Sequence, residues 1–294
     1  MSPLSRSALR LADTAAERCL RRGASEAAEL DILINAGIYR DKNLGEPALA
    51  ALIQEDIHAN LGHPPGVGHG TFSFDVGNGA CGVLSALQLL RGFLSSGAGE
   101  LGMVVASDAS PQPWPRGLIP QQRFPYRAAG GAVLVGWDDK VPGLTAFRSR
   151  TFPEYASLCE GWTEWRRRPR LFPSSPGGRN ELRIVRRPGY EARAVDCAVD
   201  VIEDLFYEVD LSAGDVDLLV ASLSADFGDA LAGRIGLPEG RVVNVPEQFA
   251  GSHTAQIIAG LEQAERSGRL ADSRTCLLVS AGSGITATAA LYQQ

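Results

Sequence analysis

The sequence predicts an α/β protein built from two similar halves. Short apolar segments bounded by turn residues alternate with longer segments whose apolar residues recur every three or four positions, as is typical of a largely parallel sheet covered by helices. The chain has 294 residues, which corresponds to two units of about 150 residues each. A weak internal repeat supports this division, because residues 128–134 resemble residues 282–291.

The first half begins with an amphipathic segment at residues 7–22, where apolar side chains recur at helical spacing before Gly23. Residues 30–36 are apolar and bounded by turn residues, as expected for a buried parallel strand. The pattern then predicts a helix at 47–60, a strand at 72–76, a glycine turn at 77–82, a helix at 83–95, and strands at 101–107 and 131–137.

Residues 150–188 interrupt this rhythm with scattered prolines and an arginine-rich run, and we interpret them as an irregular excursion that joins the halves. The predicted boundaries are 1–145 for the N-terminal half, 146–188 for the connecting excursion and 189–294 for the C-terminal half. In the second half the pattern predicts helices at 189–209, 225–235 and 255–267, and strands at 216–222, 241–245, 275–280 and 285–292.

Composition excludes several classes of protein. Hydrophobic residues make up 45% of the chain and charged residues 21%, as in ordinary globular proteins. The net charge of -6 opposes binding to nucleic acid, and no apolar run is long enough to span a bilayer. The N-terminus lacks the apolar core of a secretory signal. The five cysteines are too far apart for a metal or redox pair, so we expect reduced thiols in a cytoplasmic protein.

Cys81 is the most informative residue, because it lies in a glycine turn that follows an apolar strand and opens a helix. Unpaired backbone N–H groups and the helix dipole stabilise a thiolate at such a position. The competing interpretation is that Cys81 is a small buried residue that packs the start of the helix. The spacing alone does not decide between the two.

The order of motifs resembles the thiolase superfamily, and more closely its ketoacyl-acyl-carrier-protein synthase III branch. The resemblance implies two βαβαβ-type halves layered α-β-α-β-α, and a homodimer or a heterodimer with a related synthase. The passages that carry it are residues 31–39 with 45–48, the turn FDVGNGACG at 74–82, residues 211–220, and the C-terminal glycine motif AGSGIT at 281–286 with 289–291.

The resemblance also implies a reaction. Cys81 would take an acyl group from a coenzyme A or acyl-carrier-protein thioester, with no tightly bound cofactor. The backbone N–H groups of Cys81 and Ser283 would form the oxyanion hole, and Gly282 and Gly284 would line the substrate site beside it. Only backbone donors are needed there, so a serine between the two glycines is compatible with this role.

Two catalytic positions depart from the family pattern. Ser222 stands where condensing members carry a histidine, and the family asparagine falls on Gly251 or on the segment Ser252-His253-Thr254. We favour His253 as a general base facing the thiolate, against the alternative of a loop histidine that faces solvent or caps a helix. Ser224 and Asp226 would orient His253 or cap a helix.

Aromatic and basic residues in the excursion predict a second binding region. The resemblance places them near the mouth of the acyl tunnel, where they would hold the adenine and phosphates of coenzyme A or the surface of a carrier protein. A solvated charged face is the competing interpretation. These residues are Trp162, Trp165, Arg166, Arg167, Arg168 and Arg170. The remaining histidines, His58, His63 and His69, show no metal-ligand spacing and would line the entrance or a dimer contact.

The chain begins at its first helix, whereas family members usually open with a strand. The resemblance therefore leaves one strand missing, because the assigned start lies too late, the fold is trimmed, or another chain completes the sheet. We expect an acyltransferase of a fatty-acid, polyketide or other secondary-metabolite pathway. The alternatives are a decarboxylating condensing enzyme, which Ser222 disfavours, and a non-catalytic partner subunit of a heteromeric synthase.

Overall fold

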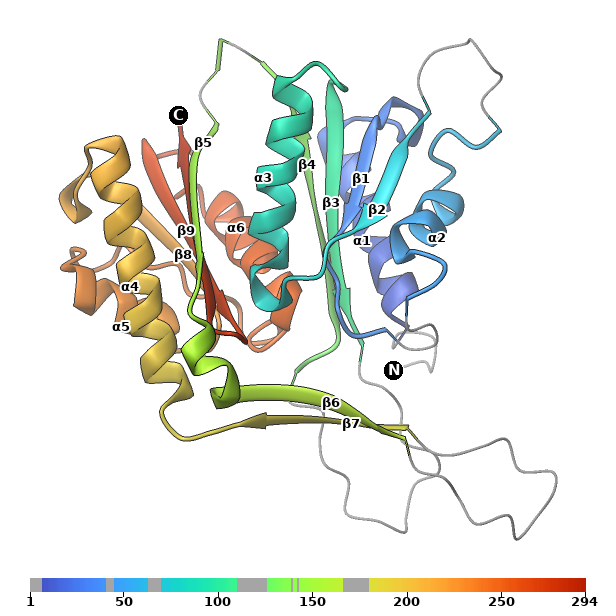
Figure 1. The fold of residues 1–294 in the computed structure, drawn as a ribbon. Coiled ribbons are helices and arrows are strands. Elements are labelled where there is room, and N and C mark those ends of the chain that lie inside the picture. Colours follow the sequence, from blue (N-terminus) through green and yellow to red (C-terminus); the bar gives the residue numbers. More distant parts are fainter. Residues whose placement is uncertain are drawn as a thin grey trace, which may run out of the picture.

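Helices and sheets alternate in layers, in the order helix, sheet, helix, sheet, helix (Figure 1). This arrangement comes from a computed structural model, which describes residues 7–40, 45–62, 70–109, 126–138, 140–141, 143–165 and 180–294. The expected layered α/β fold is confirmed. In this part of the chain, no helix has the length and apolar character needed to cross a membrane.

The sheet of the N-terminal half, sheet A, has the strand order β2-β1-β3-β4. Its strands are β1 (Ile32–Asn35), β2 (Phe72–Asp75), β3 (Leu101–Asp108) and β4 (Ala129–Gly136). The expected parallel pairing holds for β1 with β2 and β3, whereas β4 runs antiparallel to β3. Because all four residues of β1 are buried, it reads as a continuous apolar segment rather than an alternating one.

The second sheet, sheet B, has the order β5-β10-β9-β8. Its strands are β5 (Leu144–Thr151), β8 (Leu218–Ser222), β9 (Thr275–Gly282) and β10 (Thr286–Gln293). Strand β5 pairs with β10, so these residues belong with the C-terminal sheet although the predicted boundary cut through them. The strand expected at 241–245 is reduced to a single bridge between Val242 and Leu219.

Three apolar cores hold the layers together. Helices α1 (Ala8–Gly23) and α2 (Leu49–Asp56) cover the outer face of sheet A, and α4 (Tyr190–Val209) and α5 (Phe227–Ile235) cover the outer face of sheet B. Helices α3 (Gly82–Ser95) and α6 (Gln256–Arg266) lie between the sheets. Sequence and structure agree on this framework because each helix has one apolar stripe to bury.

The excursion is more regular than expected. A 3-10 helix at Pro153–Leu158 leads into β6 (Cys159–Trp165), which pairs antiparallel with β7 (Asn180–Arg186). The interpretation as an irregular segment was wrong here, because the prolines that suggested it lie outside the two paired strands. The hairpin lies at the end of the layers, below both sheets in Figure 1.

Candidate active site

Two short turns, one from each half, meet at the centre of the molecule. The first is the 3-10 turn Gly79–Cys81, which leads directly into α3, and the second is the 3-10 turn His253–Ala255, which leads into α6. The two turns pack against each other. The structure therefore brings the expected nucleophile segment and the expected base segment together, although the residues are far apart in the sequence.

His253 is held by a buried carboxylate at the end of β3. Its Nδ1 lies 3.1 Å from Oδ2 of Asp108, and the same oxygen accepts hydrogen bonds from the backbone N–H and the hydroxyl of Thr254. The other oxygen of Asp108 accepts the N–H groups of Ile38 and Tyr39 at 2.9 and 2.8 Å. With Nδ1–H donating to Asp108, the lone pair of His253 lies on Nε2.

This hydrogen-bond network keeps Asp108 ionised. Burial by itself raises the pKa of the carboxyl, but the hydrogen bonds from His253 and from the Thr254 hydroxyl help to outweigh it, and the pKa is lowered. Asp108 therefore performs the orienting role that the sequence suggested for Ser224 or Asp226. That suggestion was wrong: Asp226 lies at the start of α5, on a different loop, and makes no side-chain cap there.

The backbone of His253 is also unusual. Its φ angle is 53°, in the left-handed region that non-glycine residues rarely adopt. Two tyrosine rings pack on its imidazole, with centroid distances of 4.2 Å for Tyr126 and 5.0 Å for Tyr39. Since His253 is 8% exposed, the alternative of a solvent-facing loop histidine is excluded.

Cys81 is completely buried. Its Sγ lies 3.3 Å from each of the backbone carbonyl oxygens of Ser280 and Thr286, and burial raises the pKa of the thiol to about 12. The helix start was expected to stabilise a thiolate, but in this conformation desolvation outweighs it and the group is a thiol that donates to a carbonyl. The backbone N–H of Cys81 donates to Asn78 at 3.0 Å, so this conformation does not offer it to an oxyanion.

A small cavity lies between the two turns. Its volume is about 10 Å³, and it is lined by Ala80, Tyr126, Arg186, Tyr190, Leu223, His253, Gly282 and Ser283. Ser283 is exposed, and its backbone N–H has no acceptor among the described residues, so this N–H is available to a ligand and its oxyanion role stays a prediction. A side chain at Gly282 would approach the backbone nitrogen of Ala80 to 3.3 Å, and Gly284 adopts a φ of 129°.

Three residues of this cavity were not found from the sequence. The guanidinium of Arg186, at the end of β7, lies 5.2 Å from the ring centre of Tyr126 and 5.7 Å from that of Tyr190. The Nε of Arg186 is buried without a partner among the described atoms. Burial raises the pKa of Tyr190, so this ring keeps its proton. The alternating pattern of the hairpin was the only available signal for Arg186.

Ser222 occupies the end of β8, fully buried, beside Ser280 of β9 in the strand register. Its hydroxyl has no hydrogen-bond partner among the described residues, and the same is true of the Ser280 hydroxyl. The structure thus places an unpaired hydroxyl where the resemblance expects an imidazole. Because a serine hydroxyl is not a base at neutral pH, Ser222 cannot replace a catalytic histidine as a proton acceptor.

The remaining predicted residues are only partly described. Trp162 lies on β6 and is 42% exposed, which suits either a ligand contact or a solvated face. Residues 166–170 with their arginines, the side chain of Trp165, His63 and His69 lie outside the described residues. His58 is exposed beyond the end of α2. The described residues contain no cluster of three metal-ligating side chains.

Comparison with known proteins identifies relatives over nearly the whole chain. Residues 207–294 match the family described as 3-oxoacyl-[acyl-carrier-protein (ACP)] synthase III C terminal. A β-ketoacyl-[acyl-carrier-protein] synthase III of Sphingopyxis alaskensis is 27% identical over 95% of this chain and 81% of its own length. The enzyme of the same name from Erythrobacter litoralis is 24% identical, over 96% of this chain and 83% of its own length.

Solved structures show the same fold. A synthase III from Thermus thermophilus superposes with a TM-score of 0.76 at 23% identity, covering 98% of this chain and 85% of that chain. A variant of OleA from Xanthomonas campestris, solved with lauric acid and lauroyl-CoA, superposes with a TM-score of 0.77 at 16% identity, over 98% and 83%. At these identities the similarity establishes the fold, and the chemistry must be argued from the site.

Proposed function

We propose that this chain, which is similar to the 3-oxoacyl-[acyl-carrier-protein] synthase III proteins, is an enzyme that transfers an acyl group through Cys81 with His253 as the general base. The observation that carries this proposal is the Asp108–His253 pair at a cavity beside the turn of Cys81. A carboxylate that orients a buried imidazole is the arrangement that general-base catalysis requires.

The proposed reaction has two steps. In the first, Cys81 loses its proton to Nε2 of His253, and the sulfur attacks the thioester carbonyl, so that the Cys81–acyl bond forms and the carrier thiol leaves with that proton. In the second, an alcohol or amine acceptor gives its proton to Nε2 and attacks the acyl carbon, which breaks the bond to sulfur and restores the thiol. The backbone N–H of Ser283 stabilises the oxyanion in both steps.

The first step requires the thiol to leave its present hydrogen bonds. Cys81 must turn from the carbonyl groups of Ser280 and Thr286 toward the cavity, and the cavity must widen to admit an acyl group. The proposed acyl donor is a thioester of coenzyme A or of an acyl carrier protein. The acyl carrier protein is included because the names of the relatives contain it. A homodimer is proposed on the resemblance alone.

Decarboxylating condensation is a second candidate, because it is the reaction that the names of the relatives indicate. It shares the acyl-Cys81 intermediate with the first proposal but must also stabilise a carbanion. Ser222 supplies no charge for that purpose, and this disfavours condensation. Adding malonyl-CoA to the acylated protein and measuring carbon dioxide separates the two, since release of carbon dioxide would favour condensation.

Intact-protein mass spectrometry tests the shared intermediate. Incubation with acetyl-CoA or lauroyl-CoA is expected to add one acyl mass to the wild type and none to Cys81→Ala. Cys19→Ala is the matched control, since Cys19 is the only one of the five thiols that is not buried. No mass increment on the wild type, or an increment that survives Cys81→Ala, would overturn the proposal.

A further inference from the structure

Arg186 gives the small cavity between the two turns a positive charge. Among the described residues that line this cavity, it is the only one whose charge is permanent, and none of them is an aspartate or a glutamate. The buried carboxylate of Asp108 pairs with His253 and does not line the cavity. The cavity therefore favours a bound group that carries a negative charge.

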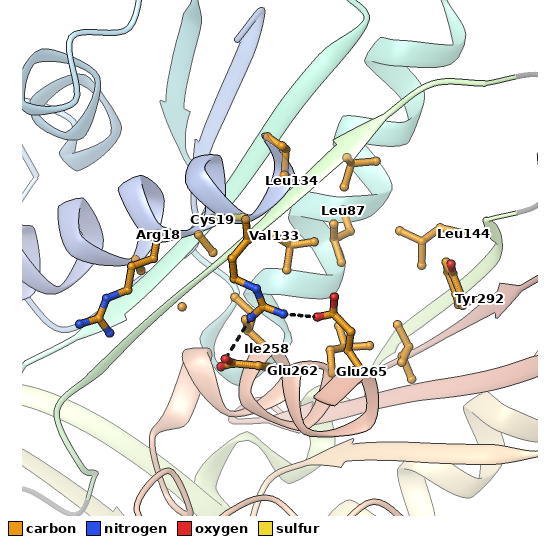
Figure 2. A pocket seen from close by; sticks show the side chains of 18 of the residues that line it. Arg18, Cys19, Leu87, Val133, Leu134, Leu144, Ile258, Glu262, Glu265 and Tyr292 are labelled. Carbon is orange, nitrogen blue, oxygen red and sulfur yellow. Dashed lines mark hydrogen bonds and ion pairs between the residues drawn. The ribbon is translucent and has the colours of Figure 1, made fainter. Parts of the chain in front are cut away.

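The charge of Arg186 is poorly paired within the protein, as a comparison with Arg22 shows. In the large groove of Figure 2, about 1370 Å³ in volume, Arg22 donates to Glu262 and Glu265 at 3.1 and 2.8 Å. The ion pair of Arg186 among the described residues is with the exposed Glu191 at 3.7 Å, beyond hydrogen-bond distance. The Nε of Arg186 is buried without a partner among the described atoms, so a strong donor is left unused.

The two tyrosines beside Arg186 do not neutralise it. The guanidinium lies 5.2 Å from the ring centre of Tyr126 and 5.7 Å from that of Tyr190, and it also shares a hydrogen bond with Tyr126. Burial raises the pKa of both phenols, so both keep their protons and carry no negative charge. The rings therefore hold the guanidinium in place, while its Nε still lacks an acceptor.

The hairpin places Arg186 beside the group that we propose as the oxyanion donor. Arg186 of β7 lies directly opposite Cys159 of β6, and the Sγ of Cys159 accepts a hydrogen bond from the hydroxyl of Ser283 at 3.5 Å. Side chains that are directly opposed in antiparallel strands are neighbours on one face. The guanidinium is therefore close to the acyl end of a thioester held at Ser283, whereas the phosphates of coenzyme A lie at the other end of the pantetheine arm.

We propose that Arg186 binds a carboxylate at the end of the acyl group, so that the enzyme prefers short dicarboxylic acyl donors to uncharged ones. This inference rests on the proposed acyl transfer through Cys81. The carboxylate accepts hydrogen bonds from Nε and a terminal nitrogen of the guanidinium, takes no part in the bond changes and stays on the acyl group after transfer. An uncharged acyl chain of the same length would leave Nε without a partner.

Acylation rates with two matched donors test this preference. The probes are succinyl-CoA, which ends in a carboxylate, and butyryl-CoA, whose acyl chain has the same length but ends in a methyl group. At concentrations far below saturation, we expect the wild type to be acylated at least about tenfold faster by succinyl-CoA. Intact-protein mass spectrometry of quenched samples measures both rates, and Cys81→Ala gives the background of acylation at other residues.

Substitution of Arg186 shows whether it causes the preference. We expect Arg186→Gln to lose the preference, because it slows acylation by succinyl-CoA more than acylation by butyryl-CoA, and Arg186→Lys to retain part of it. Arg187→Gln is the matched control and should keep the preference, since Arg187 is exposed and pairs with Glu160 across the hairpin. Thermal unfolding of each variant shows whether the fold is retained. An arginine with a purely structural role would instead affect both donors equally.

Binding without chemistry separates this inference from the proposed function. Calorimetry with Cys81→Ala should show succinyl-CoA binding at least about tenfold more tightly than butyryl-CoA, and the added Arg186→Gln should abolish the difference. If neither donor acylates the wild type, acyl transfer through Cys81 fails, and the ratio of these binding constants still decides the role of Arg186. Equal acylation by the two donors, a preference that survives Arg186→Gln, or equal binding of the two donors to Cys81→Ala would overturn the inference.

Discussion

Each half of the molecule contains a 3-10 turn of the same backbone conformation, but the two turns have different roles. Gly79–Cys81 and His253–Ala255 are equivalent 3-10 turns, each placed directly before a helix of the middle layer. The first residue of each turn is left-handed, with φ angles of 50° and 53°. Glycine takes this conformation without strain in the N-terminal half, whereas the C-terminal half places a histidine there. The protein therefore retains backbone strain at position 253, which carries the imidazole.

The halves also support each other's turns. Asp108, the last residue of β3, holds the imidazole that the C-terminal half supplies. Gly282, the last residue of β9, leaves room for the backbone of Ala80 in the N-terminal half. The equivalent strands thus end differently: β3 ends in a charged carboxylate, whereas β9 ends in a glycine that leaves space for the facing turn. The active site requires both halves, which explains why neither turn alone indicates its function.

Removal of the imidazole is the strongest test of this division of roles. We expect His253→Ala to acylate Cys81 with acetyl-CoA at least about 10²-fold more slowly than the wild type. Because the pKa of the thiol is raised to about 12, the remaining rate should increase with pH as the thiolate forms. Intact-protein mass spectrometry of samples quenched at successive times measures the acylation rate in both cases. An unchanged rate would remove His253 as the base.

Loss of the carboxylate at Asp108 should have a smaller effect. Asp108→Asn keeps the side-chain shape but allows the amide to donate to Nδ1, which leaves Nε2 protonated and unable to act as a base. We expect acylation to slow by about tenfold to 10²-fold, and ¹⁵N spectra of labelled histidine to show the changed tautomer. Thr254→Val is the matched control, since it removes one hydrogen bond to Asp108 and leaves His253 in place.

The left-handed positions predict opposite effects on stability in the two halves. His253→Gly removes the strain that His253→Ala retains, so the glycine variant should be more stable than the alanine variant by about 1 kcal/mol. Gly79→Ala should lower stability by about 1 kcal/mol, since nothing lies within 4 Å of the added Cβ and only backbone strain changes. Urea unfolding measures both. Equal stability of the two His253 variants would contradict the equivalence of the turns.

The sequence predicted the segments that hydrophobic period and turn residues determine. The strand, glycine turn and helix across residues 72–95 were found almost to their ends. The Asp108–His253 contact was not found, because 145 positions separate the partners and no local pattern marks the last residue of β3 as a site residue. The direction of the Cys81 thiol was also not predictable, since it depends on carbonyl groups of β9 and β10.

Strand β5 escaped prediction for a related reason. Its second half, Arg148–Thr151, is exposed and rich in arginine and serine, so it lacks the apolar alternation of a half-buried strand. What defines β5 is its pairing with β10, a contact across more than a hundred positions of the chain. Edge strands are specified by their neighbours, so their own residues carry a weaker sequence signal than those of central strands.

The smallest expected effect lies in the outer helix layer of the N-terminal half. Burial and the neighbouring charge of Asp56 raise the pKa of Asp13 on α1 from 3.8 to about 7. Between these values the folded protein holds a proton that the unfolded chain releases, so stability falls as the pH rises toward 7 and is level above it. Asp13→Asn should remove this slope, and the control Glu55→Gln on the neighbouring helix α2 should keep it, because the exposed Glu55 does not contribute to the shift. Melting temperatures measured from pH 5 to pH 8 test this prediction. If the melting temperature of Asp13→Asn depends on pH as that of the wild type does, another group is responsible for the titration.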